Sequence, residues 1–395
     1  MDLGDRLMLV YFAGSREGAS DVKIMSHFVD KDSLESTPQQ AILDAKMLSM
    51  MTRKFIKKLG NPVIFRDKNG KLHLFVVGVS LGGWATAKIY QLSFSDDLQS
   101  LEFKSELHLG LLANFSHLVR TPPVPLENGG FMLPLYHELA RKYALVAFFD
   151  ENANFIRASR INRLKNQLQP TIIALDSHEC LAFFRNHKAH NNASFLQKCD
   201  DFGRIWDLPK RTNLKGYDDS ALLVSYKNAK NLPRILLIYN DGRRQKDGTF
   251  KDSGGTRNSL GLYILANVGE YKGNLAQDSR ESNNDSKILR LEGAEFSTDF
   301  AFLQNIDSVE DKYPNEVSYP SAFIDKNYLF VAYTHNRKNI KIVRFDLAQI
   351  EAQIMKKLSL RGSEATEATH ESKMDCHDFA LQNLAMTEKK RKIQQ

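Results

Sequence analysis

The chain has 395 residues, of which 42% are apolar and 26% charged, a balance that excludes a wholly disordered chain and a collagen-like repeat. Its 54 lysines and arginines outnumber 47 acidic residues by seven, and the excess is spread along the chain except for a basic run at 389–392. This charge permits anionic ligands without indicating nucleic acid, so we expect no nucleic-acid partner. No run of 18 apolar residues occurs, so we expect no membrane span.

The cysteines and the N-terminal segment indicate the cellular compartment expected for the protein. Three cysteines (Cys180, Cys199 and Cys376) are too few for a disulfide framework and form no paired CxxC motif. This is typical of a reducing compartment, although bacterial secreted proteins can also be cysteine-poor. Acidic residues stand where a signal peptide would be basic, so residues 7–12 are predicted to form a strand. We therefore expect a cytoplasmic protein.

One pattern recurs along the chain: a polar or turn residue, five to eight mostly apolar residues, then a polar cluster. The six copies are 7–13 (LMLVYFA), 72–77 (LHLFVV), 131–136 (FMLPLY), 180–184 (CLAFF), 235–239 (ILLIY) and 328–333 (YLFVAY). Each has the composition and flanks of a β-strand. The intervals hold further short strands, for example 169–174, 220–225, 260–265 and 340–345, and a polar insert at 278–287 lengthens the last one. Repeats of about 50 residues with about four strands each predict an all-β, six-bladed β-propeller.

A turn motif supports this fold. Residues 199–206 (CDDFGRIW) match Ser-x-Asp-x-Gly-x-x-Trp, the Asp box of propeller blades, except that Cys replaces Ser, and 95–98 is a weaker copy. We expect the aspartate to bond its own backbone, Gly203 to take a positive φ, and Trp206 to pack between blades. The motif marks a fold and carries no chemistry.

The C-terminal part has a different composition. Residues 349–360 have helical spacing, whereas 361–395 are polar and poor in strand formers. We predict a propeller over 1–348 and a helical, then disordered, tail over 349–395. The tail cluster Asp375-Cys376-His377 has no second cluster to complete four ligands, so we expect no metal site there. No phosphate-binding loop is present, and we expect no cofactor.

Arginines near strand ends are the first candidates for function. Arg16 and Asp21 share a Gly-rich loop after the first strand, where they could place a cation and a titratable acid in one cleft or form a surface salt bridge. Arg185 follows 180–184, and Arg257 precedes 259–265. If such arginines converge on the channel of the propeller they can bind a carboxylate, but each could equally be an ordinary surface residue.

Tyr319 is the other candidate. It precedes Pro320 and cannot lie in the middle of a helix. It is either a core aromatic residue with a bonded hydroxyl or a residue of the channel. Asn61-Pro62 and Gln169-Pro170 stand at similar offsets before their own repeats, so the step before proline is partly a structural repeat.

Together these residues resemble the bacterial sialidase (neuraminidase) superfamily of six-bladed propellers, and most closely a divergent branch similar to exo-α-sialidases. The segments that carry the resemblance lie at 12–21, 61–63, 122–138, 169–171, 239–241, 319–321 and 333–337. It implies a glycoside hydrolase that removes a terminal sialic acid or related acidic sugar. Arg16, Arg185 and Arg257 resemble substrate-binding arginines, Asp21 the acid/base and Tyr319 the nucleophile.

The chain also departs from that family. In the family, the first substrate-clamping arginine lies in a strand upstream of Arg16. We expect the chain to begin after that position, as would be the case for a truncated gene product. The activating glutamate would fall near Gln169, where no carboxylate stands; Glu17, Glu138 and Glu316 are possible substitutes. Ring closure by strands from both chain ends is also expected in a propeller. Two alternatives stay open: a silent propeller that binds an acidic glycan or a protein, and a glycosidase for another sugar.

Overall fold

The computed structural model describes residues 1–110, 114–216, 218–240, 257–266, 297–310, 312 and 315–357. The chain divides into two units, Met1–Arg344 and Phe345–Gln395. In the second unit residues 347–357 are helical. The remainder of the predicted tail, with Asp375, Cys376 and His377, lies outside the described residues, as does the insert at 278–287.

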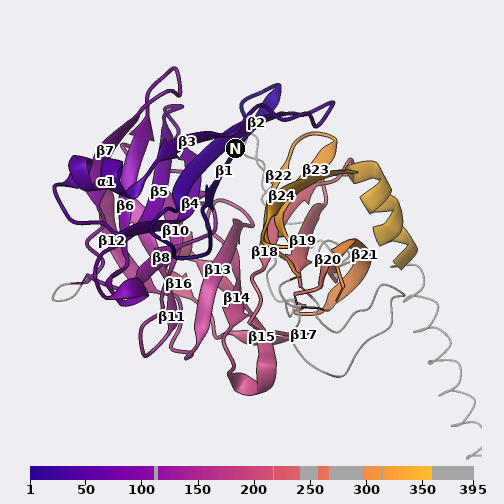
Figure 1. Cartoon of the computed structure of the whole chain (residues 1–395). Coiled ribbons are helices and arrows are strands. Elements are labelled where there is room, and N and C mark those ends of the chain that lie inside the picture. The colour runs from indigo at the N-terminus through magenta and orange to yellow at the C-terminus, as the bar shows by residue number, and fades with distance from the viewer. Residues whose placement is uncertain are drawn as a thin grey trace, which may run out of the picture. The chain divides into compact units, whose positions relative to one another are not determined.

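The strands form six antiparallel sheets, the blades of a β-propeller (Figure 1). The first three blades are β1 (Arg6–Ala13), β2 (Lys23–Asp30) and β3 (Gln40–Leu43); β4 (Lys58–Arg66), β5 (Leu72–Val79), β6 (Lys88–Phe94) and β7 (Leu101–Glu106); and β8 (His117–Val119), β9 (Val124–Pro125), β10 (Phe131–His137), β11 (Tyr143–Phe149) and β12 (Phe155–Arg160). A short helix, α1 (Ala45–Thr52), links the first two blades.

The remaining blades follow in chain order. They are β13 (Gln167–Ala174), β14 (Cys180–Asn186), β15 (Ala193–Asp200), β16 (Ile205–Trp206) and β17 (Lys210–Lys215); β18 (Leu222–Lys227), β19 (Pro233–Tyr239), β20 (Ser259–Leu265) and β21 (Phe300–Ser308); and β22 (Val317–Ile324), β23 (Tyr328–His335) and β24 (Asn339–Asp346). Three 3-10 turns, Gly83–Thr86, His190–Asn192 and Asp201–Gly203, lie in the loops.

The six repeats each contribute one strand to one sheet, namely β1, β5, β10, β14, β19 and β23. The predicted six-bladed, all-β fold is therefore confirmed. From the second blade on, the repeat is not the first strand of its sheet: it is the third strand of the third blade, after β8 and β9, and the second strand of the other blades. Arg185 therefore lies on β14, the second strand of the fourth blade. The first strands of the second to sixth blades are β4, β8, β13, β18 and β22.

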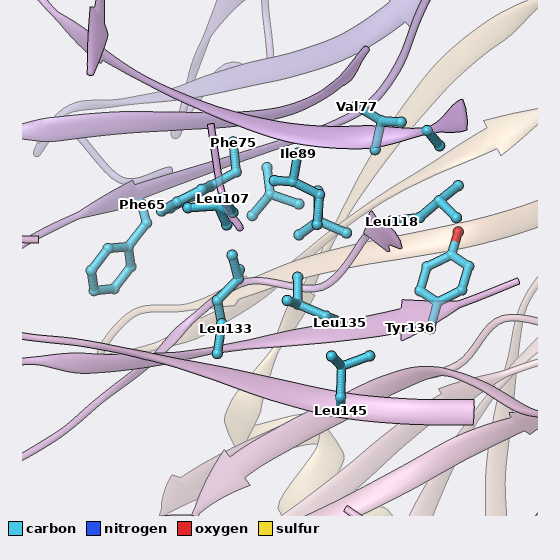
Figure 2. Packing of buried hydrophobic residues seen from close by; sticks show 14 of the residues in the cluster. Phe65, Phe75, Val77, Ile89, Leu107, Leu118, Leu133, Leu135, Tyr136 and Leu145 are labelled. Atoms are coloured by element: carbon cyan, nitrogen blue, oxygen red, sulfur yellow. The ribbon is translucent and has the colours of Figure 1, made fainter. Parts of the chain in front are cut away.

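Blades are held together by apolar side chains from facing sheets. Figure 2 shows the largest cluster, in which Phe75 and Ile89 of the second blade pack with Leu133 and Leu135 of the third. These residues are fully buried because successive strands of each blade have their apolar face covered by the neighbouring blade. Tyr136 lies at the edge of this cluster with its hydroxyl at the tip.

Three first strands share a bulge at the step before proline. Asn61, Gln169 and Tyr319 have φ of 43°, 43° and 54°, in the left-handed region. The strand register shifts between Gly60 and Val63, between Leu168 and Thr171, and between Ser318 and Ser321. Proline donates no ladder hydrogen bond, so the pairing skips these two residues and turns the preceding side chain out of the regular pleat. The repeat seen in the sequence is therefore a bulge in the second, fourth and sixth blades.

The Asp box forms the turn between β15 and β16. Gly203 has the expected positive φ of 78°. Trp206 donates from Nε1 to the Gly203 carbonyl at 2.9 Å and packs on a cluster that includes Phe148 of the neighbouring blade, as expected. The turn is closed by Asp200, whose Oδ1 accepts from the Asp201 amide, so the side chain that bonds the backbone is one position earlier than expected.

The weaker copy of the motif is the equivalent turn of the second blade. Ser95 donates to Asp97 at 2.6 Å, and Asp97 accepts from the Gln99 amide, between β6 and β7. Both copies therefore serve the same structural role.

Cys180 and Cys199 form a disulfide, which corrects the expectation of no disulfide framework for this pair. The two residues lie directly opposite each other on β14 and β15, with Cα atoms 4.9 Å apart. The number of cysteines could not show this, because the pairing depends on strand register.

The first and last sheets meet without sharing a strand in the part of the chain that is described, unlike the expected closure. Leu7, Val29 and Phe330 form a small shared cluster there. Arg344 donates from Nη1 to the carbonyls of Lys31 at 2.6 Å and Asp32 at 3.0 Å. Side chains therefore hold this seam. Among the described residues no helix is long and apolar enough to cross a membrane.

Candidate functional site

Tyr319 and Arg257 contact each other at the bulge of the last blade. Tyr319 is partly buried, and its hydroxyl accepts a hydrogen bond from Arg257 Nη1 at 3.0 Å. The guanidinium carbon also lies 4.9 Å from the centroid of the tyrosine ring. The bulge brings Tyr319 out of the sheet, and Arg257 approaches from just before β20 of the neighbouring blade. A donor of full positive charge thus faces the phenol oxygen.

The other nitrogens of Arg257 are also engaged. Nε donates to Asp219 Oδ1 at 3.3 Å, and Nη2 donates to the Asp218 carbonyl at 3.0 Å. Glu316 Oε2 lies 3.7 Å from Nη1, the nitrogen that bonds Tyr319. Glu316 is buried, and its Oε1 accepts from Ser318 at 2.8 Å. Arg257 is thus fixed between the last two blades, and its Nη1 contacts both the phenol oxygen and a carboxylate.

Arg185 lies near the same tyrosine but is neutralised by Asp218. Its Nε is 2.7 Å from Asp218 Oδ1, while Asp218 Oδ2 lies 2.9 Å from Nδ1 of His187. Burial opposes the charge of Arg185, but Tyr319 and Asp218 outweigh burial and raise its pKa above the ordinary value. Burial also disfavours the charged form of Asp218 and would raise its pKa. The hydrogen bond from Arg185 outweighs burial and holds the pKa of Asp218 below its ordinary value. The pair is therefore ionised near neutral pH.

Arg120, like Asp218 and Asp219, belongs to this cluster and was not among the residues predicted from the sequence. It follows β8 and donates to the Pro320 carbonyl from Nη2 at 2.8 Å and to the Ala221 carbonyl from Nη1 at 3.2 Å. Its guanidinium carbon is 5.8 Å from the centroid of the Tyr319 ring. Burial lowers its pKa to about 10, and the nearby charges of Arg185 and Arg257 act in the same direction.

A positional signal could have found Arg120. Asn61, Arg120 and Gln169 each stand eleven residues before the first residue of the repeat strand of their blade, Leu72, Phe131 and Cys180. The offset is shared by the second, third and fourth blades, whereas Tyr319 stands nine residues before Tyr328, the first residue of β23. A search by residue type alone does not use this spacing.

Two buried oxygen atoms, one of a carboxylate and one of an amide, lack a hydrogen-bond partner among the described residues. Asp219 is 1% exposed, and its Oδ2 has no hydrogen bond. Burial raises the pKa of Asp219 to about 7, although Arg257 and Arg185 oppose this. Gln169 donates from Nε2 to the Tyr136 hydroxyl at 3.3 Å, while its Oε1 is unpartnered. The Tyr136 hydroxyl also accepts from Asn61 Nδ2 at 3.0 Å.

The loop with Arg16 and Asp21 is exposed, and no described contact joins either residue to Tyr319. Both oxygens of Asp21 are bonded by Ser15, by its amide at 2.9 Å and its hydroxyl at 3.0 Å, and these bonds lower the pKa of Asp21. The loop connects to the cluster through Glu17, which Arg337 joins to Glu316 at 3.1 Å on each side.

The structure therefore brings Arg185, Arg257 and Tyr319 together, whereas Arg16 and Asp21 lie on the neighbouring loop. Their roles remain predictions. Of the three possible activating carboxylates, Glu316 is the one beside the Arg257–Tyr319 contact. Within the described ranges no group of three or more His, Cys, Asp or Glu residues could hold a metal ion.

The solved structures that resemble this chain include sialidases. A Hadza microbial sialidase has a TM-score of 0.63 at 12% identity, with 87% of this chain and 64% of that chain covered. Trypanosoma rangeli sialidase in complex with sialic acid has a TM-score of 0.59 at 10% identity, with 92% and 55% covered. A protein of unknown function from Dyadobacter fermentans has a TM-score of 0.56 at 13% identity, with 86% and 90% covered.

This chain thus spans less than two thirds of the length of those two sialidases, and identities this low show a common fold alone. No curated protein matches the chain in sequence. A family model does match, over residues 5–331, and its description is a BNR repeat-like domain. The chain therefore belongs to the BNR repeat-like family and has the propeller fold of the sialidases.

Proposed function

We propose that the chain is a glycoside hydrolase that removes a terminal sialic acid or a related acidic sugar, with Tyr319 as nucleophile. The observation that carries this proposal is the 3.0 Å hydrogen bond from Arg257 to the Tyr319 hydroxyl, with the Arg120 guanidinium carbon 5.8 Å from the centroid of the same ring. A tyrosine is a suitable nucleophile here because the carboxylate of an acidic sugar repels a carboxylate nucleophile.

The described contacts suggest how the residues share the reaction. The Tyr319 oxygen attacks the anomeric carbon, its proton passes to Glu316, and the bond to the leaving oxygen breaks as Asp21 protonates that oxygen. Water then cleaves the tyrosyl–sugar bond, gives one proton to Asp21, and Tyr319 recovers its proton from Glu316. Arg257 Nη1 stabilises negative charge that develops on the phenol oxygen.

The proposed role of Asp21 sets a condition. Two hydrogen bonds from Ser15 favour its charged form, whereas an acid must carry a proton. Substrate must therefore displace Ser15 from Asp21 before the carboxyl can be protonated.

The test is release of the aryl group from an aryl α-sialoside by the full chain, compared with Tyr319→Phe, Glu316→Gln and Asp21→Ala. Tyr11→Phe is the matched control, because the Tyr11 hydroxyl has no partner among the described residues. We expect turnover in the wild type and in Tyr11→Phe, and a loss of about 10³-fold or more in Tyr319→Phe. Unchanged turnover in Tyr319→Phe or Asp21→Ala contradicts the assigned role of that residue.

A second function is favoured by one observation: no carboxylate stands near Gln169, where the resemblance implies the activating glutamate. A propeller of this family without turnover would bind an acidic glycan through the same residues. Saturable binding of a sialoside by a folded chain that releases no product would support this alternative. Release of a different aryl glycoside, with none from sialosides, would indicate another sugar.

A further inference from the structure

Three large apolar side chains are exposed near α1, the helix that leads into the second blade. Leu81 is 68% exposed, and Met50 and Phe55 are each 63% exposed. Among the large apolar residues that the structure describes, only Leu208 is more exposed. A single exposed apolar residue needs no explanation, but a group of them surrounded by polar residues marks an interaction surface. We call Met50, Phe55 and Leu81 the apolar patch.

A turn of the backbone joins Met50 to Phe55. Arg53, which caps α1, has a left-handed φ of 54°, and the chain reverses direction there. Ser49 Oγ then accepts a hydrogen bond from the Ile56 amide at 3.0 Å. Met50 and Phe55 directly adjoin this bonded pair, so both lie on the same turn.

The pairing of β4 with β5 brings Leu81 to this turn. The Lys57 amide donates to the Val79 carbonyl at 2.8 Å, and Leu81 follows two residues after Val79. Leu48 and Ile56 are buried in the apolar core beneath the turn. The apolar patch therefore protrudes from a backbone that is anchored in the fold.

Basic residues surround the apolar patch. Lys46, Met50 and Arg53 stand four and three residues apart, so they share the outer face of α1. Lys57 follows on the same turn, and the three basic residues are exposed. None of them has a carboxylate partner among the described residues, and no acidic residue occurs in 45–66. The surface is thus both apolar and positively charged.

This surface adjoins the loop that carries Asp21. Lys58, the neighbour of Lys57, has its Nζ 5.0 Å from the centroid of the Trp84 ring. The same nitrogen lies 3.3 Å from the position that a Cβ atom would take on Gly18, which belongs to the Asp21 loop. A partner that covers the apolar patch therefore lies next to that loop.

We propose that the apolar patch and its three basic residues dock on a membrane surface that contains anionic lipids. Unpaired lysine and arginine side chains complement the charge of such headgroups. The exposed apolar side chains favour a lipid surface over a soluble polyanion, because only the boundary between headgroups and acyl chains removes them from water. The inference goes beyond the proposed function and does not depend on it, since docking requires no turnover.

The experiment measures co-sedimentation of the full chain with vesicles of phosphatidylcholine alone and of phosphatidylcholine mixed with phosphatidylserine. We expect binding to the mixed vesicles only. Arg53→Gln combined with Lys57→Gln should weaken binding about 25-fold, because each basic residue near an anionic surface contributes about fivefold. Lys230→Gln combined with Lys326→Gln is the matched control, since these exposed lysines lie in turns at the opposite end of their blades.

The apolar side chains are tested separately. Met50→Ser combined with Phe55→Ser should weaken binding to the mixed vesicles about tenfold, because two large side chains no longer enter the lipid. Ile205→Ser combined with Leu208→Ser is the matched control, since these two residues are exposed beside the Asp box. Phe55→Trp should add blue-shifted fluorescence when mixed vesicles are present, whereas Ile205→Trp should not.

The results that overturn the proposal are distinct. If the wild type binds mixed vesicles no better than phosphatidylcholine alone, or if the control pairs weaken binding as much as the patch variants, the surface does not dock on lipid. If the glutamine pair loses binding while the serine pair binds normally and Phe55→Trp shows no blue shift, the occupant is a soluble polyanion, which binding to dextran sulfate would confirm.

Folding and turnover are controlled independently. Circular dichroism checks the fold of every variant. If the serine pair does not fold, the fluorescence of Phe55→Trp decides, because that variant keeps an aromatic side chain at an exposed position. Vesicle binding is measured without a sialoside, so its failure leaves the proposed hydrolase standing, and failure of the sialoside assay leaves the docking surface standing.

Discussion

The bulges at Asn61 and Tyr319 have nearly the same backbone and different chemistry. Both residues are left-handed, both precede proline, and both interrupt the pairing of the first and second strands of a blade. Asn61 donates to the buried Tyr136 hydroxyl, whereas the Tyr319 hydroxyl accepts from a cation. The backbone repeat thus creates an inward position in each of these blades, and the side chain alone decides whether the position is structural or reactive.

The largest expected effect comes from making the last bulge resemble the others. Tyr319→Gln should retain the fold, since Gln169 already occupies an equivalent left-handed position before proline. If Tyr319 is the nucleophile, turnover of an aryl α-sialoside should fall by about 10³-fold or more. Thermal melting measured with activity separates the two effects. A variant that unfolds near the assay temperature contradicts the equivalence of the bulges.

Asp219, which contacts Arg257 beside Tyr319, should give an unusual pH dependence of stability. Its pKa is raised to about 7, so between about pH 4 and 7 the folded chain holds a proton that the unfolded chain has lost. Stability from this group should therefore be greatest below pH 4 and fall by about 2–4 kcal/mol as the pH rises to 8.

Urea unfolding of the wild type and Asp219→Asn at pH 5 and pH 8 measures this difference. The variant should lose less stability than the wild type over that range. Asp150→Asn is the control of opposite sign, because hydrogen bonds from Asn154 help to lower the pKa of Asp150 in an outer turn. Equal pH slopes for the wild type and Asp219→Asn would show that Asp219 is not buried as a protonated group.

A smaller effect is expected at the structural bulge. Asn61→Ala removes the hydrogen bond to Tyr136 and places alanine in a left-handed conformation, so unfolding should become easier by about 1–2 kcal/mol. Turnover should change by less than about threefold. A large loss of turnover with little loss of stability would place Asn61 in the reactive group and end the contrast with Tyr319.

The smallest expected effect tests whether the bulges before Pro170 and Pro320 have equivalent backbones. Proline at a compatible position stabilises mainly by restricting the unfolded chain, so Pro170→Ala and Pro320→Ala should each lower stability by about 0.4–1 kcal/mol. Chemical denaturation should give similar values for both. A much larger loss at Pro320 would mean that the last bulge needs its proline to hold Tyr319.

Much of the fold could be predicted because it depends on local patterns. Alternating apolar runs and turn residues recur with each blade, so the six repeats indicated six sheets. The Gly203 turn could be predicted because only glycine adopts that φ without strain. The Cys180–Cys199 bond could not, because it requires the register of β14 against β15.

The candidate site was harder to predict from the sequence than the fold. Tyr319 and Arg257 could be named from the resemblance, but their contact joins residues 62 positions apart. Arg120 was missed because its distinguishing feature is its spacing from the repeat strand at Phe131, and its neighbours Thr121 and Pro122 form no recognisable motif. Charge compensation, which separates Arg120 from Arg185, depends on which carboxylates the fold places beside each arginine, and only coordinates give that.

The seam between the first and last blades has a mechanical consequence. Its described contacts are side-chain contacts, and one of them, the Arg337 bridge between Glu17 and Glu316, ends beside Arg257 and Tyr319. Separation of the two blades breaks that bridge while every sheet keeps its own hydrogen bonds. A local opening of the seam would therefore separate the Asp21 loop from the tyrosine at a free-energy cost below that of global unfolding.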